Sequence, residues 1–225
     1  MKTIFSYKKG AYKFSDKERE ILMLLIEYFK HAIPDGNGSF LSMLELDKID
    51  FMWSPAMKDT DVFGAWVMLF KDLVFIRPAD DFSNVGGKHV DMFPSLRLDQ
   101  DLLKFTLYLL ESNGMMLSTI FHELYHKWQY RMTGILYIFN CLVFMLTGYE
   151  FSTKSKFSIE GDVRIYIDNE VLHDAIGKFY EKLYRYLWIK NRLNMVAGED
   201  YTDELAELEN DNAIMTIVNK LQNLS

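Results

Sequence analysis

The chain has 225 residues, of which 49% are hydrophobic and 15% are aromatic. This composition supplies the core of one domain, 1–225, and argues against a disordered chain. The formal net charge of −7 argues against a nucleic-acid-binding surface. The single cysteine, Cys141, excludes a disulfide framework and a cysteine-rich zinc site, and we expect it to be a buried thiol.

Two apolar segments bear on localisation. The first twenty residues lack the long apolar stretch of a secretory signal. The most apolar run, 135–146, is shorter than the ~20 residues that a bilayer span requires. We therefore predict a cytoplasmic protein without a membrane partner.

The N-terminal part of the chain contains helical signals. A capping-box pattern, Ser15-x-x-Glu18, precedes apolar residues at helical spacing and predicts a helix over about 16–32. His31 falls at the C-terminal end of this helix, where a positive charge interacts favourably with the helix dipole. We prefer this role for His31 over that of a metal ligand. A second short helix is expected within 40–50.

The segments between 62 and 109 are expected to be extended or irregular. Segments 62–70 and 73–76 are rich in apolar and aromatic residues and predict a β-hairpin. The stretch 80–99 is loop-like, and its His89 is expected at the surface rather than in contact with a substrate. Apolar and polar residues alternate from Leu103 to Leu109, which favours a strand, although a helix also fits.

The motif His122-Glu123-x-x-His126 lies in a predicted helix over about 115–132, with Gly134 just past its end. Histidines at i and i+4 share one helix face, so both imidazoles can reach one tetrahedral Zn²⁺ with the glutamate beside it. The apolar residues form a separate stripe that we expect to be buried: Leu117, Ile120, Phe121, Leu124 and Trp128. The polar face carries Ser118, Thr119, His122, His126 and Gln129.

The run 117–130, with its H-E-L-x-H-x-W-Q core, resembles the active-site helix of zincin metallopeptidases. It is most similar to small gluzincin-like peptidases of bacteria and their phages, over about 117–170. The resemblance implies an α+β fold, in which a small β-sheet packs on the HExxH helix and a mainly helical part follows. It also implies an edge strand that pairs with extended peptide substrate. The hairpin or the segment from Leu103 can play that part, and either can equally just complete the core.

The rest of the chain is predicted to be mainly helical. The run 135–146 is expected to be a buried helix, with a substrate-pocket wall as the other interpretation. The following segments are expected in order: a surface loop over 149–157, a helix from Ser158 into the 160s, a long amphipathic helix to about 192, an acidic solvated helix within 199–212, and a last helix over 214–224.

A catalytic zinc takes three protein ligands and keeps an open position for water. Gluzincins take the third ligand from a Glu on the next long helix, and by this resemblance we choose Glu160, with Val163 in place of the usual alanine. Val163, Ile167 and Val171 are expected to share its face. Asp162 would then hold a ligating His in place. The alternatives left open as the third ligand are Glu150, Asp162, Asp168, Glu170, His173 and His89.

The resemblance implies hydrolysis of peptide bonds in a peptide or protein substrate. Glu123 is then the general base that takes a proton from zinc-bound water. An oxyanion donor is also needed, and Tyr149, Arg164, Tyr166 and His173 are candidates. The competing interpretation is a non-enzymatic zincin-like protein that keeps zinc for stability, as a structural or phage-associated component.

Overall fold

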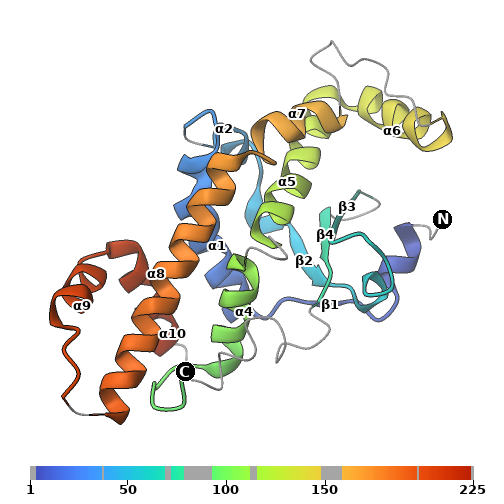
Figure 1. The fold of residues 1–225 in the computed structure, drawn as a ribbon. Coiled ribbons are helices and arrows are strands. Elements are labelled where there is room, and N and C mark those ends of the chain that lie inside the picture. The colour runs from blue at the N-terminus through green and yellow to red at the C-terminus, as the bar shows by residue number, and fades with distance from the viewer. Residues whose placement is uncertain are drawn as a thin grey trace.

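The computed structural model describes residues 4–36, 38–68, 72–78, 93–111, 116–147, 159–196 and 198–223. Over these ranges the protein is α+β, with a small mixed sheet beside a mainly helical body (Figure 1). The strands are β1 (Tyr12–Lys13), β2 (Asp50–Trp53), β3 (Gly64–Met68) and β4 (Asp72–Ile76). The α-helices are α1 (Asp16–Phe29), α2 (Ser39–Ser42), α4 (Gln100–Leu110), α5 (Met116–Thr133), α6 (Ile135–Thr147), α7 (Ile159–Tyr166), α8 (Glu170–Met195), α9 (Thr202–Glu209) and α10 (Asn212–Asn223).

The sheet has the strand order β1-β2-β4-β3. β3 and β4 are antiparallel, which confirms the predicted hairpin, and β2 lies parallel to β4. The short strands β1 and β2 were not predicted. β3 is at one edge of the sheet and packs against α5. The strand beside the HExxH helix therefore comes from the hairpin and not from the segment that starts at Leu103.

Helix α1 begins as the capping box predicts. The Ser15 hydroxyl accepts a hydrogen bond from the Glu18 amide at 3.2 Å, and the Glu18 carboxylate accepts one from the Ser15 amide at 2.6 Å. The other Glu18 oxygen accepts from the indole of Trp53 in β2 at 3.2 Å. A short 3₁₀ helix, Lys30–Ala32, ends the segment at the predicted place. Between 40 and 50 the expected helix is replaced by the four-residue α2 and a 3₁₀ turn, Leu46–Lys48.

The segment from Leu103 is helix α4, so the preferred strand was wrong. Polar residues that suggested an outward face are buried and bonded internally. The Thr106 hydroxyl donates to the Leu102 carbonyl at 2.8 Å, and the Tyr108 hydroxyl donates to the Arg77 carbonyl at 2.7 Å. Asp99 starts the helix by accepting from the Leu102 amide at 3.0 Å. These internally bonded polar side chains produced an apparent alternation of apolar and polar residues, and this alternation led to the error.

Helix α6 forms where it was predicted, but its expected burial was wrong. Ile135 is 78% exposed and Leu146 is 83% exposed, while Cys141 is only partly buried. Gly134, at φ +59°, ends α5 and turns the chain, so that α6 projects from the body (Figure 1). Among the described residues, no helix combines the length and the apolar character that crossing a membrane requires.

The C-terminal helices follow the predicted order. α8 is the long amphipathic helix, and α9 and α10 pack against it (Figure 1). Val163 and Ile167 are fully buried as expected, but Val171 is 65% exposed. The helix is interrupted between Tyr166, where α7 ends, and Glu170, where α8 begins. The face shared by Val163 and Ile167 therefore does not continue to Val171. The loop expected over 149–157 lies outside the described residues.

Candidate metal centre

The candidate site is built on helix α5, which is bounded by β3, α6 and α7. The predicted apolar stripe anchors this helix. Leu117, Ile120, Phe121 and Leu124 are all fully buried, and Trp128 is partly buried. Anchoring one face fixes the rotation of the helix and directs His122 and His126 to the side opposite the core.

The two histidines converge as the motif predicts. Nε2 of His122 lies 3.0 Å from Nε2 of His126. Each outer ring nitrogen has an oxygen partner. Nδ1 of His122 lies 3.2 Å from Oδ1 of Asp168, and Nδ1 of His126 lies 3.1 Å from Oε1 of Gln129. An ionised carboxylate only accepts, so the Asp168 contact favours a proton on Nδ1 of His122, and an amide oxygen at Gln129 favours the same tautomer of His126.

This tautomer would suit a metal ion. With both Nδ1 atoms donating outward, the two Nε2 lone pairs would face each other across 3.0 Å. Such lone pairs repel, and a cation between them would relieve the repulsion. A tetrahedral Zn²⁺ at about 2.0–2.1 Å from each nitrogen would set the two nitrogens roughly 3.3–3.4 Å apart. The pair therefore needs to open by only about 0.3–0.4 Å, and the donor set fits zinc.

Asp168 and Gln129 contact the outer ring nitrogens of His122 and His126, the kind of contact that orients metal-ligating histidines in other proteins. Asp162 was expected in this role, and the structure places Asp168 and Gln129 there. Burial alone would raise the pKa of Asp168, but the hydrogen bond from His122 and nearby positive groups lower it overall. Burial lowers the pKa of the neighbouring His173, and the Asp168 charge opposes that change. Asp168 is thus held as the carboxylate that His122 needs.

Glu123 lies between the histidines and the sheet. Its carboxylate is buried, and Oε2 accepts a hydrogen bond of 2.7 Å from the backbone amide of Trp66 in β3. β3 is an edge strand of the sheet, and the Trp66 amide donates to helix α5. Gly64 permits the approach, because a Cβ there would lie 2.6 Å from Cγ2 of Thr119 and 3.1 Å from Cγ of Glu123.

The third ligand stays a prediction. Glu160 lies in the first turn of α7, which packs against α5, but its side chain is outside the described part of the chain. Among the described side chains, no group of three or more His, Cys, Asp or Glu is arranged for a metal. Asp168 contacts the outer nitrogen of His122, and Glu170 belongs to the separate helix α8. Glu150 and His89 lie outside the described residues.

The expected oxyanion donors are not gathered at one point. Tyr166 stacks on Tyr125, with ring centroids 5.8 Å apart, and Arg164 is exposed. His173 lies close enough for its charge to act on Asp168, and Tyr149 is outside the described residues. The structure therefore does not single out a donor.

An aromatic cluster beside His126 was not predicted from the sequence. Tyr137 of α6 lies 6.2 Å from the His126 ring and 6.1 Å from Trp66, and Tyr130 lies 5.6 Å from Trp66. The three rings come from three elements, so no local spacing could reveal them. They give the histidine face an apolar wall.

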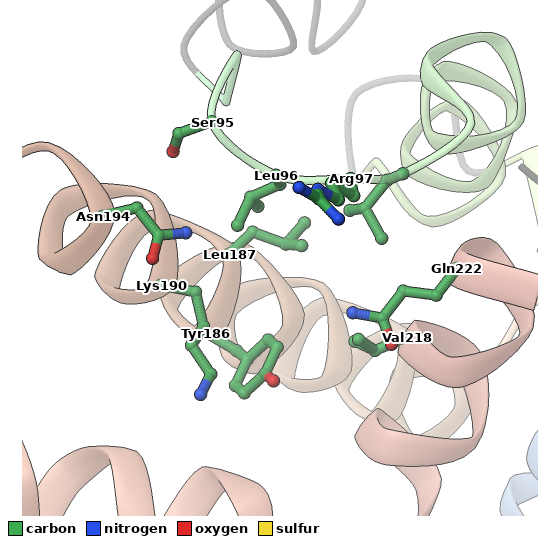
Figure 2. Close-up of a pocket in the computed structure, with 10 residues that line it drawn as sticks. Ser95, Leu96, Arg97, Tyr186, Leu187, Lys190, Asn194, Val218 and Gln222 are labelled. Atoms are coloured by element: carbon green, nitrogen blue, oxygen red, sulfur yellow. The ribbon is translucent and has the colours of Figure 1, made fainter.

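A cavity of about 430 Å³ lies apart from α5, between α8, α10 and the segment 95–98 (Figure 2). Tyr186, Leu187 and Lys190 line it from one helix, and Gln222 lines it from another. Lys190 is paired with Glu209 at 2.5 Å. None of the predicted site residues lines this cavity, so the proposed chemistry is not assigned to it.

Comparisons with protein-family models, with curated proteins and with solved structures find no match to this chain. The assignment of the metal centre therefore depends on the geometry around α5.

Proposed function

We propose that the protein is a zincin-like, zinc-dependent peptidase in which His122 and His126 hold the metal and Glu123 is the general base. One observation carries the proposal. The Nε2 atoms of the two imidazoles converge to within 3.0 Å of each other, and each outer ring nitrogen lies within hydrogen-bond distance of a side-chain oxygen. A chance pair of histidines needs neither the convergence nor the two outer contacts.

Each step of the proposed reaction is assigned to a particular residue. His122 and His126 bind the ion, and Glu160 on α7 is proposed as the third ligand. Zinc in this position would lower the pKa of a water toward neutrality and polarise the substrate carbonyl. Glu123 then takes the water proton at Oε1, since Oε2 holds the Trp66 amide, and passes it to the leaving amine. β3 is an edge strand, and we propose that its main-chain groups other than the Trp66 amide, which donates to Glu123, pair with an extended peptide.

Zinc content tests the metal site. Purified untagged protein should carry about one zinc per chain by mass spectrometry, and His126→Ala should lose it. His31→Ala is the control, because His31 is exposed and its Nδ1 lies 3.3 Å from the Gly36 carbonyl oxygen. Glu160→Ala should weaken zinc binding sharply, and Glu150→Ala should leave it unchanged. Full zinc retention by His126→Ala would refute the metal site.

Activity on a peptide library tests the general base. Glu123→Gln keeps an oxygen that can accept from the Trp66 amide, so the fold and the zinc should remain. Hydrolysis should fall by about 10²–10⁴-fold, the usual effect of removing a general base. An active Glu123→Gln protein would overturn the assignment.

The second candidate function is a structural zinc site. The observation that favours it is the Glu123–Trp66 hydrogen bond, which connects β3 to α5 and gives Glu123 a role in the fold. This function predicts that zinc-loaded wild-type protein hydrolyses none of the library, while zinc removal lowers the unfolding temperature. Hydrolysis that depends on Glu123 excludes it.

A further inference from the structure

Helix α6 exposes apolar side chains to solvent along its whole length. None of its 13 residues carries a charge. The large apolar side chains exposed along one side are Ile135, Leu136, Phe139, Leu142 and Leu146. We call this set the α6 stripe. A contiguous exposed apolar surface on a folded protein usually marks a place where another molecule binds.

The end of α6 far from α5 is exposed on opposite sides. Phe144 is exposed too, and it lies nine positions after Ile135, which is two and a half helical turns and therefore the other side of the helix. Near the start of α6, the side that carries Tyr137 faces the body, and the Tyr137 ring lies 6.2 Å from the ring of His126. The rest of the helix projects from the body (Figure 1). Its far end therefore needs a partner that surrounds it.

A second copy of the chain would cover too little of α6. Thirteen residues make a helix about 20 Å long, and half the side of a cylinder of that length, about 11 Å wide, has an area of roughly 350 Å². A specific protein interface buries about 800 Å² on each partner. A partner laid along the α6 stripe would also leave Phe144, on the other side, in water.

A lipid bilayer matches the shape and the charge of α6. Acyl chains can contact an inserted helix on all sides, and the helix satisfies its own backbone groups there. A length of about 20 Å is less than the ~30 Å of the hydrocarbon core, so α6 enters one leaflet and does not cross. Because α6 is uncharged and the chain has a formal net charge of −7, apolar contact and not headgroup charge must supply the attraction.

We propose that α6 inserts into one leaflet of a lipid bilayer with zwitterionic headgroups and so holds the protein at a membrane surface. The expectation of no membrane partner was drawn from the length of 135–146, which excludes crossing only. The insertion does not depend on zinc or on peptide hydrolysis. It places the metal centre beside the bilayer, because α6 follows α5 directly and Tyr137 lies next to His126.

Flotation with phosphatidylcholine vesicles tests the insertion. The purified protein should float with the vesicles equally well with and without a zinc chelator. Adding phosphatidylserine should weaken binding, because the lipid and the protein are both negatively charged. High salt should not release the protein from phosphatidylcholine, since salt screens charges and not apolar contacts. Absence of flotation, or release by salt, would overturn the inference.

A double variant, Ile135→Asp with Leu146→Asn, tests whether α6 is the inserted element. Both side chains are more than three quarters exposed, so the fold should remain, and circular dichroism checks it. Vesicle binding should weaken by at least about tenfold, because polar and charged side chains are disfavoured in the apolar part of a bilayer. Val171→Asp, at an exposed apolar position in the first turn of α8, is the control and should bind like wild type. Undiminished binding of the double variant would overturn the inference.

Sedimentation velocity without vesicles distinguishes lipid from a second copy. The protein should sediment as a monomer at micromolar concentration. A dimer that the double variant abolishes would overturn the assignment to lipid and identify a second copy as the partner of α6. Vesicle binding by protein that fails to bind zinc would refute the proposed function and leave the insertion standing, whereas zinc-dependent hydrolysis without vesicle binding would refute the insertion alone.

Discussion

Gly64 controls how closely β3 approaches the HExxH helix, and Gly64→Ala should force the two apart. The new Cβ would lie 2.6 Å from Cγ2 of Thr119 and 3.1 Å from Cγ of Glu123, against about 3.5–4.0 Å for a relaxed carbon contact. Overpacking of this kind costs about 1–3 kcal/mol, and the stiffer unfolded chain returns about 0.4–1 kcal/mol. The midpoints of these two ranges leave a net loss of about 1.3 kcal/mol, which should lower Tm by roughly 3–5 °C in a chain of this length.

Thermal unfolding followed by circular dichroism on metal-free protein measures the effect of Gly64→Ala. Gly177→Ala is the matched control, because nothing lies within 4 Å of a Cβ there and the residue is inside α8. It should raise Tm by roughly 2–4 °C, since alanine favours a helix interior over glycine by about 1 kcal/mol. Adding Thr119→Ser, which removes Cγ2, should recover part of the loss. An unchanged Tm in Gly64→Ala, or no recovery, would refute the close approach.

Two further predictions concern carboxylates. Asp168→Asn should lower zinc affinity by about 10–100-fold in competition with a chelating dye, and Asp174→Asn should leave it unchanged, because only Asp168 contacts a proposed ligand. Partial burial would raise the pKa of Asp99, but the Leu102 amide and the Lys17 ammonium lower it overall. Its ionised form therefore stabilises the fold above its unfolded pKa of about 3.9, and this contribution is lost as pH falls through the lower folded pKa. Urea unfolding of Asp99→Asn should show a smaller stability change than wild type between pH 7 and pH 3, and an equal change would contradict this sign.

The features that the sequence determined are those encoded by neighbours along the chain. The start of α1 follows from two residues three positions apart, Ser15 and Glu18. The convergence of His122 and His126 follows from their spacing of four on a helix, together with an apolar stripe that fixes which face turns inward. Local spacing settles these features because helical geometry relates such residues whatever the rest of the fold does.

Tertiary structure decided which surfaces meet. Apolar content predicted helix α6 but could not tell that its side chains would stay exposed, and the buried α4 looked like a strand because its polar groups bond inside the core. The Trp66 amide reaches Glu123 across 57 positions of sequence, and Asp168 reaches His122 across 46. These contacts depend on how β3 and the α7–α8 junction dock on α5, and docking is set by the packing of whole elements. The motif predicted which histidines converge, and only the tertiary structure revealed that Asp168 contacts the outer nitrogen of His122.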